Sequence, residues 1–392
     1  MKKTLKRILC CSLSALTVST LALERKLAGA DTENLGATTA TASFKNVTGQ
    51  YDTSALRESY LNKSVMQSED SAPKYETRTV IVTLSGDNMV EKADGESVKD
   101  YLSTFAGNNA KANIADEQNA FLRALSKKGI SYTLEGRYNN VVNGVAIEVD
   151  TKYVSEIKKM SGVESVVITT AYSEPKTVAT STDGDKVVTN ETNVYKTGIY
   201  DSSEYAAQYG EGTVVAVLDT GLDYTHPAFQ GFQSENVNVA WSREYVQSLL
   251  EDNDLISESR SGSLEISDVY VSSKVPFAYD YADDDPDVYP SYSNHGTHVA
   301  GIIGGYDTNG YTDKDGNPID ETFVGVVPDS QLVICKVFTD DLDDPDLGGA
   351  VSEDIIAALD DCVMLGVDVI NMSLGTSCGF TTTDDGDSEG GS

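Results

Sequence analysis

The sequence predicts a small α+β domain followed by an α/β domain built on a parallel sheet. Between residues 74 and 172, strand and helix periodicities follow the order strand, helix, strand, strand, helix, strand. From about Gly210, nearly continuous apolar strands alternate with amphipathic helices, which is typical of a parallel sheet covered on both faces. Residues 173–200 are rich in Thr, Ser and Asp, which indicates an exposed linker between the two domains.

The elements expected in the first domain follow the split βαβ pattern of a ferredoxin-like sandwich. A helix has Val98, Tyr101, Leu102 and Phe105 on one face, and the helix after the paired strands runs from Tyr153 to Met160. The strands are expected at residues 78–84, 131–137, 141–149 and 163–168, with a further helix at 115–128.

The elements expected in the second domain predict a doubly wound sheet. Strands are expected at 212–218, 331–338 and 367–374, with a helix opening near His295 and another at 351–365. Residues 381–392 are Thr, Asp, Gly, Ser and Glu, which have no core-forming power. We therefore expect the sheet of this chain to be incomplete.

The first 30 residues have the pattern of an export signal. Four basic residues precede an apolar run at 8–23, and small residues at 28–30 resemble a cleavage site. A membrane anchor that is not cleaved is the alternative, although the apolar run is short for a span. Residues 31–73 lack sustained periodicity and are expected to form a flexible leader.

Composition limits the classes of function. The chain has 392 residues and a formal net charge of −33, so it would repel nucleic acid over most of its surface. Cys10 and Cys11 lie in the signal, and Cys335, Cys362 and Cys378 have no metal-type spacing and imply no disulfide framework. We expect Cys335 and Cys362 to be small core residues.

One candidate site residue ends an apolar strand. Residues 214–218 lead into Asp219, and the chain then turns at Gly221. Ligands bind outside the carboxyl ends of parallel strands, so Asp219 is placed to orient a histidine. The alternative is an acidic residue that only caps a turn.

The second candidate is a histidine at a predicted helix start. His295 and His298 are two of only three histidines in the chain, and both lie in the block from Ser293 to Gly301. Small residues around the imidazole allow close packing, and such a group can act as a general base near neutral pH.

Three blocks together resemble one family. Residues 218–221, 295–301 and 370–375 are similar, in this order, to motif blocks of the subtilisin-like serine proteases of the peptidase S8 family. The resemblance covers about residues 74–380 and is strongest to the lactocepin type of cell-envelope proteinase. It implies that 74–172 form an inhibitory propeptide of the I9 type and that 201–392 form the N-terminal part of the catalytic domain.

The resemblance also implies roles for individual residues. Asp219 would orient and electrostatically support the imidazole of His295, which would act first as general base and then as general acid. The backbone of Ser373, Leu374 and Gly375 would pair with an extended substrate peptide. No cofactor is required for this chemistry. The expected partners are protein or peptide substrates and the chain's own propeptide, bound intramolecularly, and the expected location is secreted or attached to the cell envelope.

The sequence departs from the family where the nucleophile belongs. No Gly-Thr-Ser-Met-Ala type block and no preceding oxyanion asparagine occur in the chain. The tripeptide at 375–377 mimics the block, but it follows Ser373 and Leu374 directly and precedes Cys378. We therefore expect a precursor that is truncated before its serine and is inactive as given, because no acyl-enzyme can form.

Three further hypotheses remain at this point. The acidic runs at 283–287 and 340–346 could hold structural calcium, and solvated loops are the alternative. Residues 218–221 also resemble the aspartic protease motif, but only one copy occurs and such enzymes need two aspartates. The first domain could act without catalysis, as an inhibitor or folding assistant of related proteases.

Overall fold

The structure is a computed structural model that describes residues 75–173, 209–251, 255–308, 311–312, 318–319, 323–340 and 349–375. The expected signal peptide and leader, most of the linker, and Cys378 lie outside these ranges. Within them, no helix is long and apolar enough to span a bilayer.

We keep the names first domain for residues 75–173 and second domain for the described residues from 209 onward. The first domain contains an antiparallel sheet with the strand order β2-β3-β1-β4. One face of β1 carries Val80 and Val82, which share a buried cluster with Phe121 and Leu125 of helix α5. The opposite face carries Ile81, which belongs to a cluster shared with the second domain. Strand β1, in the interior of the sheet, is therefore buried on both faces. The elements of this domain are β1 Thr77–Leu84, α3 Met89–Ala93, α4 Val98–Leu102, α5 Phe105–Lys127, β2 Tyr132–Tyr138, β3 Gly144–Asp150, η1 Thr151–Tyr153, α6 Val154–Ile157 and β4 Val163–Ile168.

Helix α5 is longer than the sequence pattern predicted. It begins at Phe105 because the Thr104 hydroxyl accepts a hydrogen bond from the backbone N–H of Gly107 at 3.0 Å. The helix predicted from Val98 therefore ends at Leu102, and Phe105 is 84% exposed rather than part of its apolar face. The capping threonine was the signal that separates the two helices.

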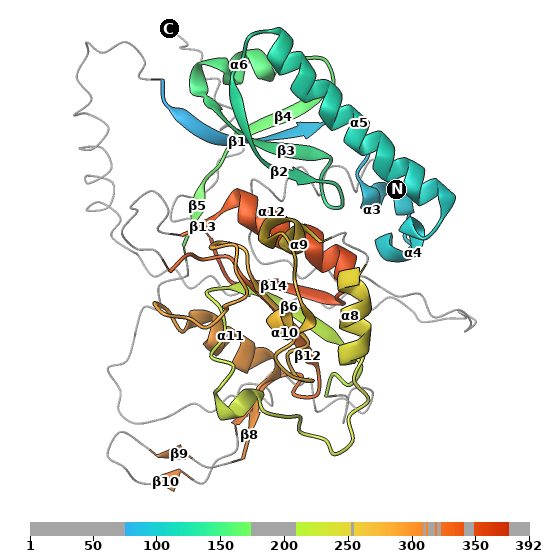
Figure 1. The fold of residues 1–392 in the computed structure, drawn as a ribbon. Helices are drawn as coiled ribbons and strands as arrows, with labels where there is room; N and C mark the ends of the chain where they lie inside the picture. Colours follow the sequence, from blue (N-terminus) through green and yellow to red (C-terminus); the bar gives the residue numbers. More distant parts are fainter. Residues whose placement is uncertain are drawn as a thin grey trace, which may run out of the picture. The chain divides into compact units, whose positions relative to one another are not determined.

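The second domain contains a parallel sheet with the strand order β14-β6-β12-β7, which confirms the α/β prediction (Figure 1). Alternate residues of β6 bury on opposite faces. Ala216 shares a cluster with Ile356 of helix α12, whereas Val217 shares one with Ala300 of helix α11. The elements are β6 Val214–Asp219, β7 Phe277–Asp280, α11 His295–Gly304, β12 Gln331–Lys336, α12 Ser352–Leu365 and β14 Val369–Met372.

Shorter elements surround this sheet. They are β5 Ala171–Tyr172, η2 Pro227–Phe229, α8 Arg243–Glu251, α9 Ile256–Ser261, α10 Ile266–Val269, β8 Tyr306–Asp307, β9 Tyr311–Thr312, β10 Pro318–Ile319, β11 Phe323–Val324 and β13 Ala350–Val351.

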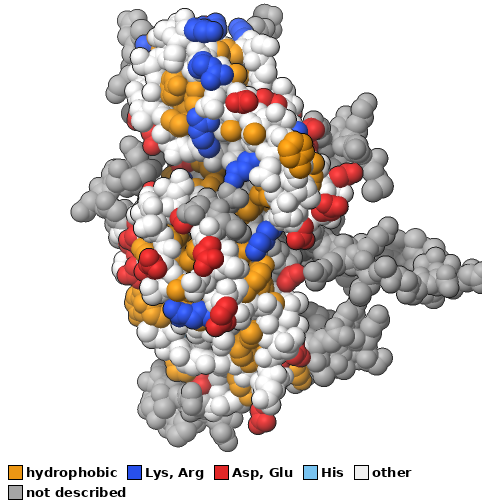
Figure 2. Space-filling model, turned by 45° about the vertical axis from the view of Figure 1, so that its right-hand side comes forward, with side chains coloured by type: hydrophobic (Ala, Val, Ile, Leu, Met, Phe, Trp, Pro, Cys, Tyr) orange, Lys and Arg blue, Asp and Glu red, His pale blue; other side chains and the backbone are white. Residues whose placement is uncertain are grey.

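The charged side chains are mixed on the molecular surface. On the face drawn in Figure 2, acidic and basic side chains lie among hydrophobic ones, so the net negative charge does not form a single uniform patch there.

Candidate active site

Asp219 is the last residue of β6, at the carboxyl end of the parallel sheet. Its side chain is 1% exposed, and its Oδ1 accepts a hydrogen bond of 2.7 Å from the backbone N–H of Thr220. Gly221 follows with a φ of 103°, where a Cβ would lie 2.3 Å from the carbonyl oxygen of Val288. Glycine is therefore required for the turn that places the carboxylate.

His295 is the first residue of α11, as the sequence predicted. Its Nδ1 lies 2.7 Å from Asp219 Oδ1, and its side chain is 18% exposed. A carboxylate in this position accepts a hydrogen bond from Nδ1–H, which leaves the lone pair of the neutral imidazole on Nε2. The arrangement can therefore take up a proton at Nε2 while the carboxylate supports the charge.

A close approach of two backbones holds this pair together. A Cβ on Gly296 would lie 2.4 Å from the carbonyl oxygen of Gly221. The Gly296 N–H donates to the Thr220 hydroxyl at 2.9 Å, and that hydroxyl donates to the carbonyl of Ser293 at 2.9 Å. Thr220 therefore fixes the start of α11 against the end of β6.

The predicted peptide-binding residues lie beside the end of the first domain. The Ser173 N–H donates to the Gly375 carbonyl at 2.8 Å, and the Gly375 N–H donates to the Ser173 carbonyl at 3.0 Å. On its other side, the same segment pairs antiparallel with β13, with Ala350 opposite Tyr172. Residues 171–173 thus form the middle strand between β13 and Gly375.

The side chain of Tyr172 is buried at the centre of this strand. It is 8% exposed and belongs to the same cluster as Phe338, Ala350 and Leu374. Leu374, for which the family resemblance implied substrate binding, therefore contributes to the apolar surroundings of this segment. Ser373 accepts a hydrogen bond from the Asn371 side chain at 3.0 Å.

A second contact between the domains involves Asp360 of α12, which sequence reasoning missed. Its carboxylate accepts hydrogen bonds from the backbone N–H groups of Asn139, Asn140 and Val141, the shortest being 2.8 Å to Val141. Burial raises the pKa of Asp360 to about 7, against the opposing effect of these N–H groups. The signal for this role in the sequence was an acidic residue within an otherwise apolar helix stripe.

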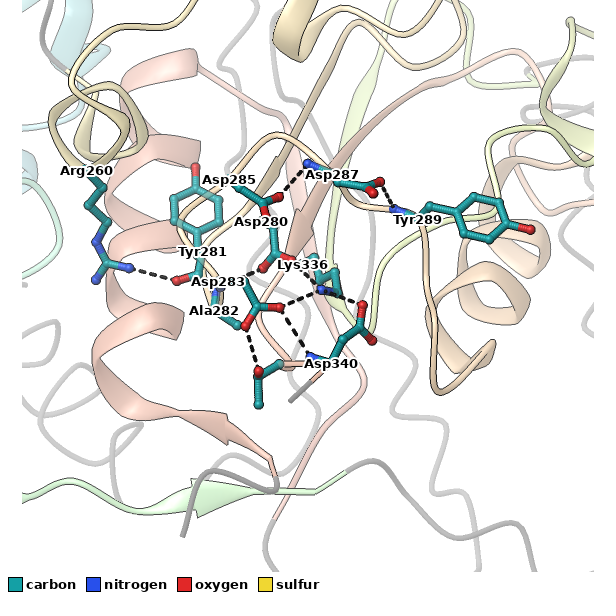
Figure 3. Close-up of polar contacts among 11 residues, drawn as sticks. Arg260, Asp280, Tyr281, Ala282, Asp283, Asp285, Asp287, Tyr289, Lys336 and Asp340 are labelled. Atoms are coloured by element: carbon teal, nitrogen blue, oxygen red, sulfur yellow. Dashed lines mark hydrogen bonds and ion pairs between the residues drawn. The ribbon is translucent and has the colours of Figure 1, made fainter. Parts of the chain in front are cut away.

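An acidic cluster surrounds Lys336 at the end of β12 (Figure 3). Strand β12 pairs with β6, the strand that carries Asp219. The ammonium contacts the carboxylates of Asp280, Asp283 and Asp340. Although burial lowers the pKa of Lys336, these carboxylates outweigh it and raise the pKa above its ordinary value.

The position of Lys336 is relevant to the prediction that the two acidic runs hold calcium. Asp283 and Asp340, one from each acidic run, lie against Lys336. Across the residues that the structure describes, no group of three or more His, Cys, Asp or Glu side chains is arranged to hold a metal ion. The first run lies wholly within those residues, whereas 341–346 of the second lie outside them, and calcium binding there remains a prediction.

Comparison with known proteins identifies the second domain. Residues 210–392 match the model of the subtilase family. This part of the chain is therefore subtilisin-like, as its three motif blocks indicated.

The resemblance to proteinases of the lactocepin type is also confirmed. The PII-type proteinase of Lacticaseibacillus paracasei is 30% identical over 308 residues, which are 78% of this chain and 14% of that protein. The PIII-type proteinase of Lactococcus lactis subsp. cremoris gives the same values. The minor extracellular protease Vpr of Bacillus subtilis is 25% identical over 76% of this chain and 30% of its own length. The chain thus spans a minor part of each of these relatives.

Proposed function

We propose that the chain is the N-terminal part of a secreted serine endopeptidase precursor, in which Asp219 and His295 are two members of an Asp-His-Ser triad. The observation that carries this proposal is the 2.7 Å contact between His295 Nδ1 and the buried carboxylate of Asp219. The imidazole acts as general base toward a serine hydroxyl and then as general acid toward the leaving amine.

We infer that the nucleophile lies in a part of the longer relatives that this chain does not match. The printed sequence has neither the family's serine block nor its oxyanion asparagine, and the chain matches 14% of the PII-type proteinase. We infer that residues 1–392 alone do not hydrolyse peptide bonds, because attack on the carbonyl needs that serine. Export is supported by the first 30 residues, which have the pattern of a signal peptide. It is also supported by the relative Vpr, which is named an extracellular protease.

Residues 74–172 act in this proposal as a ferredoxin-like inhibitory propeptide. Two contacts support an inhibitory role: the pairing of Ser173 with Gly375 and the binding of residues 139–141 by Asp360. A peptide held by backbone hydrogen bonds on both sides has the geometry of a bound substrate strand. The propeptide therefore blocks the site that Ser373, Leu374 and Gly375 offer to substrates.

Processing of the protein expressed from its complete coding frame tests this proposal. We expect removal of the first domain by a cut on the carboxyl side of Ser173, found by N-terminal sequencing of the mature protein. The His295→Ala variant should remain uncut under the same conditions. Equal processing of both proteins, or a mature N-terminus at or before residue 173, would contradict the proposal.

An inhibitor or folding assistant without catalysis is the second candidate, and the same interdomain contacts favour it. It predicts that residues 74–175 alone inhibit related subtilisin-like proteases. A failure to slow any of them at micromolar concentration counts against this candidate and does not bear on the roles proposed for Asp219 and His295.

A further inference from the structure

Two buried thiols face each other in the second domain, outside the candidate active site. Cys335 of β12 and Cys362 of α12 are both 0% exposed, and their sulfur atoms lie 3.8 Å apart. Both are in the reduced form in this structure. The sequence pattern assigned both to the core but gave no reason to pair them.

The two cysteines lie on elements with different tasks. Cys335 is on the central part of the sheet, opposite Leu218 of β6 and Tyr279 of β7. Cys362 is two residues after Asp360, whose carboxylate holds the first domain. A bond between them would join the sheet that positions Asp219 to the helix that contacts the propeptide-like domain.

We propose that Cys335 and Cys362 form a disulfide when the chain folds in the presence of a disulfide oxidant such as oxidised glutathione. The sulfur–sulfur distance in a disulfide is about 2.0 Å. The distance between these two sulfur atoms must therefore shorten from 3.8 Å to that value. The proposal is independent of the proposed protease function.

The chemistry proceeds by two exchanges. The thiolate of one cysteine attacks oxidised glutathione, forms a mixed disulfide and releases one glutathione thiolate. The second cysteine thiolate then attacks the protein sulfur of the mixed disulfide, which forms the Cys335–Cys362 bond and releases the second glutathione. The two thiol protons pass to the released glutathione thiolates. Two protein thiols are thereby oxidised and one glutathione disulfide is reduced.

The bond should form during folding rather than afterwards. Burial raises the pKa of the Cys335 thiol well above its ordinary value, and the neighbouring Cys362 and Asp361 raise it further. A buried neutral thiol is a poor nucleophile, and glutathione cannot reach it in the folded domain. Oxidant added to the folded, reduced protein should therefore react slowly.

The bond would restrain β13, the strand that flanks residues 171–173 on one side. It closes the loop that contains β13, which pairs with β5, and the start of α12. Closing a loop reduces the entropy of the unfolded chain, so the oxidised protein should unfold at a higher denaturant concentration than the reduced protein. Strand β13 would then stay attached to the sheet when the first domain dissociates.

Mass spectrometry of a non-reduced digest of the full chain tests the proposal. The chain is refolded with oxidised and reduced glutathione, and remaining thiols are alkylated in denaturant before digestion. We expect a cross-linked peptide pair that contains Cys335 and Cys362, and only Cys10, Cys11 and Cys378 alkylated or joined to glutathione. Alkylation of both Cys335 and Cys362, or a bond from either one to another cysteine, would overturn the proposal.

A variant with Cys10, Cys11 and Cys378 replaced by alanine gives the matched stability measurement. Its guanidinium midpoint should be higher when oxidised than after reduction. The same variant with additional Cys335→Ala and Cys362→Ala changes should show no such difference. An oxidised and a reduced midpoint that coincide in the two-cysteine variant would contradict the proposal, whatever the refolding yield.

Discussion

At the scale of single residues, the candidate site depends on small groups as much as on its two titratable side chains. Asp219 and His295 meet because Gly221 and Gly296 allow the end of β6 and the start of α11 to approach. Thr220 then links both segments through its hydroxyl. Removing this close approach should move the imidazole without touching either titratable group.

Replacing Gly296 with alanine should therefore destabilise the second domain. The new Cβ would lie 2.4 Å from the Gly221 carbonyl oxygen. Overpacking of this kind costs about 1–3 kcal/mol. Gly231→Ala is the matched control, since nothing lies within 4 Å of its Cβ position and its φ is not positive. Urea unfolding measures both, and equal midpoints would contradict the account.

Lys274 gives a prediction about pH. Its ammonium group donates to the carbonyls of Pro328 and Ser330 at 2.7 Å each, and burial lowers its pKa to about 7. The ordinary pKa of a lysine is 10.5. Between pH 7 and pH 10.5, Lys274 therefore binds a proton in the unfolded state that it does not bind in the folded state. This group's contribution to the free energy of unfolding therefore rises with pH in that window.

The Lys274→Met variant isolates this effect. The wild-type protein should gain stability relative to the variant by up to about 1.4 kcal/mol per pH unit between pH 7 and 9. Urea unfolding at pH 7, 8 and 9 measures the difference. A difference that stays constant across these values would show that Lys274 keeps its proton in the folded state.

At the scale of elements, helix α12 serves both domains. One side packs on β6, and the other presents Asp360 to the loop between β2 and β3. Ser173 and Gly375 form a second connection at the end of the first domain. The first domain is thus attached at its β2–β3 loop and at its final strand.

Asp360→Asn should loosen the first of these attachments. The amide keeps one acceptor oxygen but turns an N–H donor toward backbone N–H groups, which costs about 1.5–3 kcal/mol. Hydrogen exchange of the amides of residues 139–141 should become faster. Glu156→Gln is the control, because Glu156 pairs with Lys128 at an exposed site. Unchanged exchange at residues 139–141 in Asp360→Asn would contradict the role given to this carboxylate.

At the scale of the whole molecule, the sequence was sufficient where local patterns decide the structure. The apolar run before Asp219 predicted β6, and the block around His295 predicted the start of α11. The role of Asp360 could not be predicted, because its partners at residues 139–141 lie far away in the chain. The role of Lys336 could not be predicted either, because two of its three carboxylate partners, Asp280 and Asp283, are also distant. The extent of α5 was misjudged because the Thr104 cap was overlooked in favour of apolar periodicity.

The central claim is that Asp219 and His295 form the acid–base part of a serine protease site. The measurement that tests it most directly is the kcat for peptide hydrolysis by Asp219→Asn in the protein expressed from its complete coding frame. The account predicts a fall of about 10⁴-fold, because the imidazole loses the carboxylate that orients and supports it. The control is His226→Asn, which keeps a side-chain acceptor for the Ala228 N–H at the start of η2. A kcat for Asp219→Asn equal to that of the unchanged enzyme would contradict the account.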